Sequence, residues 1–260
     1  MLFVHENNMK SKILSNYKGC GEKIKWFYNE VYMPMRSKIL NLDFCVENYS
    51  AFVEATEEFN IYYKKIEDFS TKNSISAQSK FASTFLEEIS SYLFKDLPEI
   101  KNGTFGVYNK NIYAGLKIDN NSHISIISKD VDFCIGKKAT MIIDEQEPID
   151  AIIPVVAVEV KTYLDATMFG EIKSSSKSIR SASPNSKAYV LMGYKCIADE
   201  HIVAARQDST LTEMFALRNS ENSPILSEVI FEYWTEINSA VMAASSEMAV
   251  PSSGRLLKVN

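Results

Sequence analysis

The sequence predicts an α/β (α+β) fold, with a helical N-terminal region, a mixed central sheet and a C-terminal helix. Two observations carry this prediction. In the first third of the chain apolar residues recur at intervals of three and four, whereas residues 102–161 hold short β-rich runs separated by Gly and Asn. One more helical pattern and one more buried strand follow, so the central part has the order helix, three strands, helix, strand.

Helices are expected on both sides of the sheet. In the third of them Phe81, Phe85, Ile89 and Leu93 stand four apart, which gives the helix one apolar face that can dock on the sheet. The predicted helices before the sheet span residues 22–40, 47–69 and 76–94, and those after its third strand span residues 165–183 and 223–242.

The run VVAVEVK, which starts at Val155, places two charged residues at the end of an apolar strand. Side chains two apart on a strand point the same way. Glu159 and Lys161 therefore share one face, while Val158 and Val160 on the other face are expected to pack under helices.

A hairpin leads into this strand, because DEQEPID is the only turn-like cluster between the strand and the run before it. If the strands are antiparallel around a turn at residues 145–146, the residue facing Glu159 is Asp132. Asp130, two residues earlier and on the same side, is the nearest rival. Asp150 lies at the far end of the strand and is a poor one.

A basic stripe is predicted on the helix that begins after Asp165, its expected N-cap. Lys173, Lys177 and Arg180 are spaced by four and three, so they share one side of this helix. The net charge of the chain is −5, yet residues 161–195 hold six positive and two negative residues. An acidic protein can therefore carry a basic face, although an ordinary solvated helix face is the alternative.

Composition and motifs exclude several classes of protein. A chain of 260 residues with 46% hydrophobic content is long enough for a sizeable core, and no apolar run approaches the roughly 18–20 residues of a membrane span. We expect a cytoplasmic protein without a membrane partner, with its four scattered cysteines reduced. No phosphate-binding glycine motif occurs, so no nucleotide cofactor is expected. His5, His123 and His201 are too widely spaced to suggest a histidine metal site.

Two carboxylates beside one lysine suit a hard divalent cation that serves phosphodiester hydrolysis. Mg²⁺ takes oxygen ligands and usually only one or two carboxylates. Asp132 and Glu159 would hold the ion, and Lys161 would orient the attacking water and offset charge on the transition state.

These residues resemble the PD-(D/E)XK nucleases, which share an αβββαβ core, an Asp at the start of the second strand and E-x-K at the end of the third. Asp132, Glu159 and Lys161 match this pattern, with Val160 as the x and Val131 where a proline is usual. The resemblance implies that all three are catalytic, that Asp132 and Glu159 bind the metal, and that the main-chain carbonyl of Val160 is a further candidate ligand.

Some members of that family add a metal-site carboxylate from the helix before the sheet. Glu87 and Glu88 lie at this place, and a plain solvated helix face is the alternative for both.

The stretch SKDVDFCIGK followed by EVKTYLDATM is similar in particular to type II restriction endonucleases of the BbvCI-like group, over roughly residues 75–220. This implies Mg²⁺-dependent, sequence-specific hydrolysis of double-stranded DNA, giving 5′-phosphate and 3′-hydroxyl ends. Two alternatives stay open: a structure-specific repair or recombination nuclease of the same fold, and a DNA-binding protein without catalysis.

Double-stranded DNA is thus the expected partner. Lys173, Lys177, Arg180 and Lys187 are the candidate backbone contacts, and Tyr163, Asn185 and Lys187 lie near enough to be considered for base reading.

A duplex cutter needs two active sites and this chain carries one, so a homodimer is expected, with a heterodimer of related subunits as the alternative. We assign residues 1–72 to a helical region for DNA recognition, dimerisation or both, and residues 73–260 to the nuclease core. The N-terminal helices or the helix at residues 223–242 could form the interface, although core packing within one chain explains both equally well.

Overall fold

The computed structural model describes residues 2–121, 123–142, 147–208 and 210–245. The hairpin turn predicted at residues 145–146 lies outside the described residues. Over the described part of the chain, no helix is long and apolar enough to cross a membrane.

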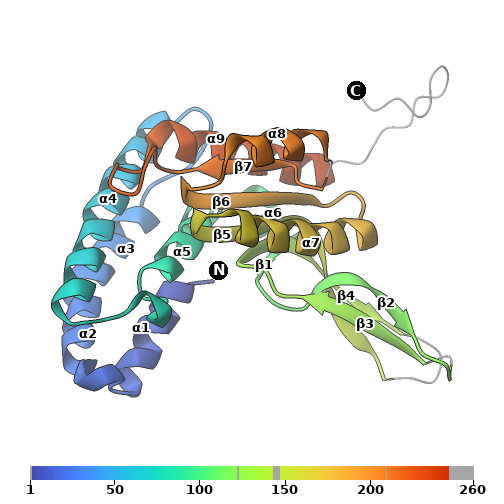
Figure 1. Cartoon of the computed structure of the whole chain (residues 1–260), viewed down its shortest axis with the longest axis horizontal. Helices are drawn as coiled ribbons and strands as arrows, with labels where there is room; N and C mark the ends of the chain where they lie inside the picture. Colours follow the sequence, from blue (N-terminus) through green and yellow to red (C-terminus); the bar gives the residue numbers. More distant parts are fainter. Residues whose placement is uncertain (1, 122, 143–146, 209, 246–260) are drawn as a thin grey trace.

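Helices form the N-terminal region, as expected (Figure 1). The predicted helix at residues 22–40 is divided by a π-helical turn at Tyr28–Tyr32, and the predicted helix at residues 47–69 is one long helix that ends at Lys72. The first helix was not predicted. The helices are α1 (Val4–Leu14), α2 (Gly21–Phe27), α3 (Met33–Leu40) and α4 (Tyr49–Lys72).

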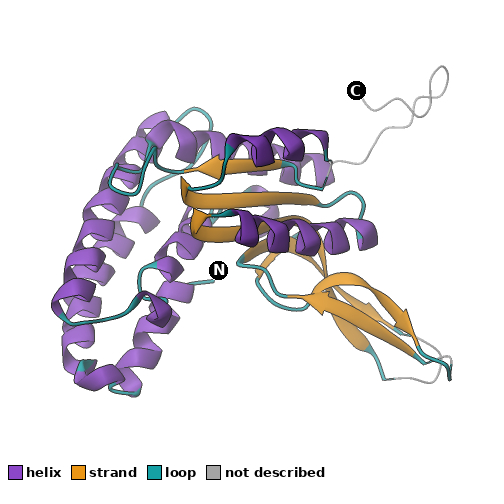
Figure 2. Cartoon of the chain, viewed as in Figure 1, coloured by secondary structure: helices purple, strands orange, loops and turns teal. Residues whose placement is uncertain are grey.

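The rest of the chain is an α+β core, which confirms the predicted fold class (Figure 2). The elements that were not predicted are α6, β2, α8 and β7. The helices are α5 (Ser83–Leu93), α6 (Pro98–Lys101), α7 (Ala166–Ala182), α8 (Asp199–Gln207) and α9 (Ser227–Ser245). The strands are β1 (Gly106–Tyr108), β2 (Ile112–Ile118), β3 (Ile124–Lys129), β4 (Phe133–Met141), β5 (Ile149–Leu164), β6 (Lys187–Lys195) and β7 (Glu213–Ala216).

The described strands form one mixed sheet around β5. Strand β5 pairs antiparallel with β4 and parallel with β6, and β7 continues the parallel side. Near the start of β5, Ile152 pairs with Ile112 of β2, and the two strands run parallel there. Strand β2 in turn pairs antiparallel with β3. Since β5 has 16 residues, it can hold both groups of strands together.

Helices cover both faces of the central strands. Val156, Val158 and Val160 of β5 lie in the large hydrophobic core, under α5 and α9, as the sequence predicts. Helix α7 packs on the opposite face against β2, β5 and β6, and its buried residues include Phe169 and Ile179. Asp165 caps α7, since its side chain accepts a hydrogen bond from the Met168 N–H at 2.8 Å.

The helical region and the sheet share one core. The predicted domain boundary after residue 72 coincides with the end of α4. A single hydrophobic cluster nevertheless runs from Met9 and Phe59 in the helical region to Phe133 and Val158 in the sheet. The N-terminal helices are therefore packed firmly on the α+β core.

A β arm projects from the core on the side away from the N-terminal helices (Figure 1). We use this name for β2, β3 and the ends of β4 and β5 nearest their hairpin. Two irregularities lie where the arm leaves the core, one in β2 between Tyr113 and Gly115 and one in the β4–β5 pair. Bulges bend strands and increase their twist. Gly115, with a φ of +143°, adopts a conformation that favours glycine.

Candidate active site

The three residues of the predicted Asp and Glu-x-Lys motif meet at one point, where β4 begins beside β5. The Lys161 Nζ lies 3.3 Å from Glu159 Oε2 and 3.5 Å from Asp132 Oδ2. The Val160 N–H donates a 2.6 Å hydrogen bond to Asp132 Oδ2, which fixes this carboxylate against β5. The side chains are 26% (Asp132), 17% (Glu159) and 29% (Lys161) exposed, so the cluster is half-buried but reachable from solvent.

The register of β4 and β5 creates this meeting. Near the hairpin Met141 pairs with Ile149, a register that would bring Asp132 opposite Val158 and so to the wrong face of the sheet. An irregularity between Ile135 and Gly136 shifts the pairing by one residue. Beyond it Phe133 pairs with Val158, and the same register sets Asp132 against Glu159, as the hairpin symmetry predicts.

Pro154 and Gly136 explain why the irregularity lies there. Proline has no N–H to donate to a sheet ladder, so inside a sheet it is confined to edges and bulges. Pro154 pairs with Gly136 at the shift. A Cβ at Gly136 would lie 2.5 Å from the carbonyl oxygen of Ile153, so only glycine fits against the bulged strand. Pro154 and Gly136 therefore set the register that places Asp132 opposite Glu159.

Crowding of charge perturbs the cluster. Burial raises the pKa of Glu159, and the nearby charge of Asp132 raises it further, while Lys161 acts in the opposite direction. Burial alone would lower the pKa of Lys161, but the charges of Asp132 and Glu159 outweigh it and raise the pKa. One lysine thus partly balances two carboxylates, an arrangement that attracts a further positive charge.

Glu87 lies near enough to this cluster for its charges to act on it, and Glu88 is engaged elsewhere. Burial raises the pKa of Glu87 to about 7, with a further contribution from Asp132, and the nearby charges of Lys80 and Lys161 act against it. Glu87 on α5 therefore faces the candidate site, and Lys80, which was not predicted, lies near it. Neither glutamate belongs to a plain solvated helix face.

Glu88 points to the opposite side of α5, into the helical region, where it is fully buried. Its Oε2 accepts hydrogen bonds from the N–H groups of His5 and Glu6, and its Oε1 accepts hydrogen bonds from the hydroxyls of Tyr32 and Tyr92. With both oxygens engaged there, Glu88 is not available to the cluster at Asp132.

The two rival aspartates lie elsewhere. Asp130 Oδ1 accepts a 3.4 Å hydrogen bond from the Asn111 N–H and is exposed. Asp150 binds Lys138 at 2.6 Å and the Thr140 hydroxyl at 2.7 Å, far along the hairpin. Asp132 is therefore the aspartate that faces Glu159.

The donor set fits Mg²⁺ better than a softer metal. No group of three or more His, Cys, Asp or Glu side chains suited to a metal occurs among the described residues. Mg²⁺ does not need such a group, because it binds through one or two carboxylates and completes its shell with water and phosphate oxygens. Asp132 and Glu159 supply two carboxylates of this kind, and the Lys161 ammonium lies beside both of them.

The basic stripe lies along a shallow cleft on the outer side of α7. Lys173, Lys177 and Arg180 line this cleft of about 660 Å³, together with Asp208 and Thr210. Lys173 forms an ion pair of 2.7 Å with Asp208, a contact that the spacing of the sequence could not reveal.

The remaining predicted DNA contacts lie at the two ends of β6. Lys187 is exposed at its start and pairs with Val156. Tyr163, at the end of β5, is exposed, and its ring centre lies 6.1 Å from that of Tyr194. Asn185 is exposed in the loop before β6.

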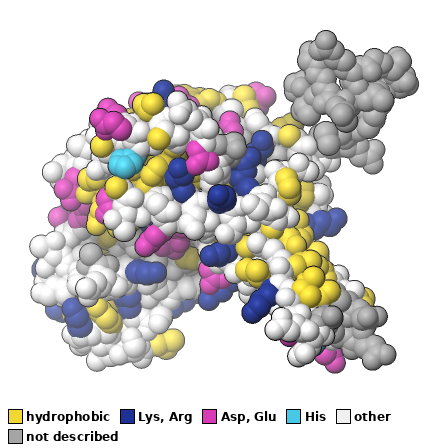
Figure 3. Space-filling view, turned by 45° about the vertical axis from the view of Figure 1, so that its right-hand side comes forward, with side chains coloured by type: hydrophobic (Ala, Val, Ile, Leu, Met, Phe, Trp, Pro, Cys, Tyr) yellow, Lys and Arg dark blue, Asp and Glu magenta, His cyan; other side chains and the backbone are white. Residues whose placement is uncertain are grey.

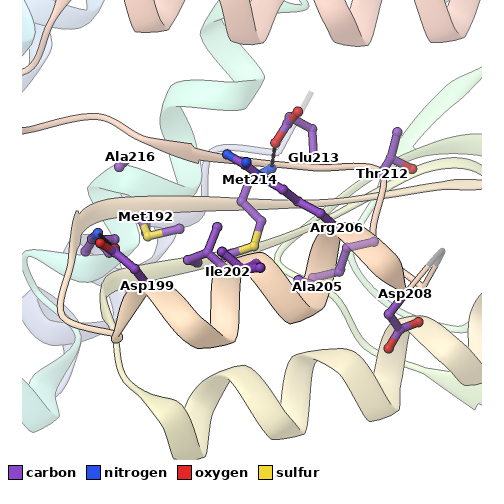
Figure 4. A pocket seen from close by; sticks show the side chains of 13 residues that line it. Met192, Asp199, Ile202, Ala205, Arg206, Asp208, Thr212, Glu213, Met214 and Ala216 are labelled. Atoms are coloured by element: carbon purple, nitrogen blue, oxygen red, sulfur yellow. Dashed lines mark hydrogen bonds and ion pairs between the residues drawn. The ribbon is translucent and has the colours of Figure 1, made fainter.

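A separate pocket of about 750 Å³ lies between α8 and the strands β6 and β7 (Figure 4). Met192, Ile202 and Met214 give it an apolar floor, and Asp199 and Arg206 lie at its rim (Figure 4). None of its lining residues belongs to the Asp132 cluster, so this pocket is separate from the candidate active site.

An α+β core of this topology, with an Asp and a Glu-x-Lys brought together on neighbouring strands, defines the class of restriction-endonuclease-like nucleases. The family model described as Bpu10I restriction endonuclease matches residues 78–230, which is more than half of the chain. The chain therefore belongs to the Bpu10I restriction endonuclease family, and this membership implies nuclease activity and DNA binding.

A solved structure supports the fold assignment over nearly the whole chain. It is described as the native BbvCI A2B2 tetramer at low resolution, and it matches with a TM-score of 0.76, covering 94% of this chain and 98% of that one. The sequence identity is 12%, so this likeness concerns the fold. It confirms that the chain shares its fold with this structure. The search of curated proteins gave no match.

Proposed function

We propose that this chain is a type II restriction endonuclease that hydrolyses double-stranded DNA at specific sites with Mg²⁺. The observation that carries the proposal is the convergence of Asp132 and Glu159 on Lys161, whose Nζ lies 3.5 Å and 3.3 Å from their carboxylate oxygens. Membership of a restriction endonuclease family supports DNA as the substrate.

Each residue of the cluster has a role that follows from its position. Asp132 and Glu159 hold Mg²⁺, which supplies charge stabilisation at the scissile phosphate and acidifies water. The Lys161 ammonium orients the attacking water and offsets negative charge on the phosphate. The water oxygen bonds to phosphorus while the bond from phosphorus to the 3′ oxygen breaks, which leaves 5′-phosphate and 3′-hydroxyl ends.

Glu87 is the best placed additional residue. Besides burial, the charges of Asp132 and Glu159 raise the pKa of Glu87. A cation bound between Asp132 and Glu159 would therefore also attract the Glu87 carboxylate. We propose that Glu87 contributes to metal binding through a bound water or directly, and that Glu88 has no part in it.

DNA is held by basic residues of α7 and of the start of β6. Lys177 and Arg180 are the main candidates on α7, and Lys187 is a third at the start of β6. Contacts of this kind position the duplex without reading its sequence.

A homodimer is the proposed working form, because cutting both strands needs two active sites. The description of the similar structure as an A2B2 tetramer supports assembly of chains with this fold. We also propose a cytoplasmic location.

Incubation of the pure chain with plasmid DNA and MgCl₂ tests the function. Discrete fragments with 5′-phosphate ends are expected, and end-labelling with kinase before and after phosphatase treatment checks the ends. Cutting of branched DNA only would favour a repair nuclease, and intact DNA with a retained gel shift would favour a binding protein; either result would overturn the proposal.

A further inference from the structure

The turn that leads into α5 carries a lysine in a strained backbone conformation. Lys80 has a φ of +56°, in the left-handed region that side chains other than asparagine rarely adopt. Such a conformation costs free energy and persists only where the surrounding structure enforces it. Lys80 is exposed, and glycine would adopt this conformation without strain. A lysine at this position therefore indicates a use for its side chain.

Hydrogen bonds on both sides of Lys80 hold it in place. Its carbonyl accepts hydrogen bonds from the Thr84 N–H at 3.2 Å and from the Thr84 hydroxyl at 2.7 Å. The same hydroxyl lies 3.0 Å from the ring of His5 in α1, and the side chain of Asn8 in α1 donates a hydrogen bond to the Ser79 carbonyl. Helices α1 and α5 together therefore enforce the conformation of Lys80.

The Lys80 side chain lies close to the candidate active site. Lys80 precedes Glu87 by seven residues, and the hydrogen bond from the Thr84 N–H extends the helical pattern of α5 back to it. Residues two helical turns apart lie on the same side of a helix. Burial raises the pKa of Glu87, and among the positive charges that oppose this rise Lys80 acts more strongly than Lys161.

The Lys80 ammonium is not used within the chain. It forms no hydrogen bond and no ion pair within the part of the chain that the structure describes. Lys18, in the turn before α2, is also exposed and has a φ of +49°. Its ammonium, however, donates a 3.4 Å hydrogen bond to the Ser74 carbonyl. Of these two strained lysines, Lys80 is the one whose charge is left for a partner.

The shape of the molecule places a large partner beside this turn. Figure 1 shows that the connection from α4 to α5 and the β arm lie on the same side of the sheet. Figure 3 shows the molecule hollowed between its rounded body and the arm, with Lys and Arg side chains on both sides of the hollow. Basic side chains around a hollow suit a nucleic-acid backbone.

We infer that Lys80 binds a phosphate of the DNA strand that enters the candidate active site, beside the phosphate held at Asp132 and Glu159. This inference rests on the proposed function. A lysine ammonium is a compact point charge that suits a phosphate oxygen. The Glu87 carboxylate does not neutralise Lys80, because the two form no ion pair and Glu87 is proposed to serve the metal.

The test is the salt dependence of DNA binding. Lys80→Gly removes the ammonium and should reduce the slope of log binding constant against log salt by about 0.9, the value for one phosphate contact. Filter binding of a labelled plasmid fragment in Ca²⁺ buffer at several salt concentrations measures this slope. Lys80→Arg keeps the charge and should retain the slope of the wild type.

Lys18→Gly is the matched control, because it also replaces an exposed lysine that has a positive φ. Both glycine variants should unfold at a higher urea concentration than the wild type, since each relieves backbone strain. The slope should fall in Lys80→Gly alone. A fall of the same size in Lys18→Gly would show that any exposed lysine has this effect and would overturn the inference.

The alternative is that Lys80 only balances the charge of the acidic cluster. Lys80→Gly would then leave the salt slope unchanged and lower the MgCl₂ concentration needed for half-maximal cutting, because the site would become more negative. An unchanged slope overturns the inference.

Plasmid cutting separates this inference from the proposed function. A wild-type chain that binds DNA without cutting it, and whose slope falls in Lys80→Gly, would remove the function and keep the phosphate contact. A wild-type chain that cuts DNA, with an unchanged slope in Lys80→Gly, would keep the function and remove the contact.

Discussion

Two neighbouring residues on α5 lie in opposite electrostatic surroundings. Glu88 is fully buried, and its two oxygens accept four hydrogen bonds, two of them from backbone N–H groups in the first turn of α1. Burial raises its pKa, and these hydrogen bonds oppose the rise. Glu87 faces Asp132 and Glu159, which are acidic like itself.

The difference indicates that Glu88 serves the stability of the fold, whereas Glu87 lies among the groups proposed to serve catalysis. A buried carboxylate whose acceptors are all satisfied holds a structure together. Carboxylates that crowd one another beside a single lysine are not arranged for stability, and such strain is typical of sites that bind an ion. Four predictions test this contrast.

The largest effect is expected at the crowded cluster. Glu159→Gln or Lys161→Ala should reduce the rate of DNA cutting by at least about 10²–10³-fold, because each removes a group that stabilises the reacting phosphate. Single-turnover cutting in MgCl₂ measures this rate. Binding in Ca²⁺ buffer and the free energy of unfolding should stay close to those of the wild type. Full activity in either variant would refute the assigned roles.

The next effect is expected at Glu88. Glu88→Ala should lower the free energy of unfolding by about 3–5 kcal/mol, because it leaves buried donors without acceptors. Urea denaturation measures the change. Glu87→Gln is the matched control on the same helix and should change stability by less than about 1 kcal/mol while slowing the cutting. If the two variants were equally destabilised, the contrast between the neighbours would be wrong.

A smaller effect is expected in the pH dependence of the free energy of unfolding, through His5, which lies beside Glu88. Burial, with a contribution from Lys12, lowers the pKa of His5 to about 3, and its ring hydrogen-bonds Thr84 and Tyr62. A lowered pKa means that the folded state binds the proton less well than the unfolded state. Stability from neutral His5 is therefore complete above pH 6.5 and is lost as the pH falls towards 3, by at most about 1.4 kcal/mol per unit.

The variant His5→Gln isolates this contribution. Glu88 remains in both proteins, so its opposite pH dependence cancels in the difference. Unfolding in urea at pH 7, 5 and 4 should show the wild type losing more stability than the variant. Parallel curves would exclude a buried neutral histidine.

The smallest effect is expected on the basic stripe of α7 that is proposed to hold DNA. Lys177→Ala or Arg180→Ala should lower the slope of log binding constant against log salt by about 1 each. Fluorescence anisotropy in Ca²⁺ buffer at several salt concentrations measures the slope. Lys173→Ala is the control, because Asp208 already neutralises Lys173 and the slope should change less. Equal changes of the slope in all three variants would contradict the proposal that Lys177 and Arg180 contact DNA more closely than Lys173 does.

The sequence was sufficient to predict the convergence of Asp132 and Glu159, because alternation along strands and one turn cluster set the pairing. The predicted pairing is correct only because of a feature that was not predicted, the one-residue shift of register at Pro154 and Gly136. A proline inside a buried strand was the available signal.

Other features left no local signal. Strand β2 was missed because its outer half, with Lys117 and Ile118, lies in the exposed arm and carries no buried face. Glu87 and Glu88 could not be told apart, since their surroundings depend on α1, which was not predicted. The ion pair between Lys173 and Asp208 joins residues far apart in the chain.

The capping of α1 bears on the order in which the protein folds. Phe3 at the start of this helix provides no side-chain cap, and the acceptor for the His5 and Glu6 N–H groups is Glu88. During synthesis α1 is therefore made before the residue that caps it. It must wait for α5 before it becomes stable, so we expect α1 to fold no earlier than α5 in the nascent chain.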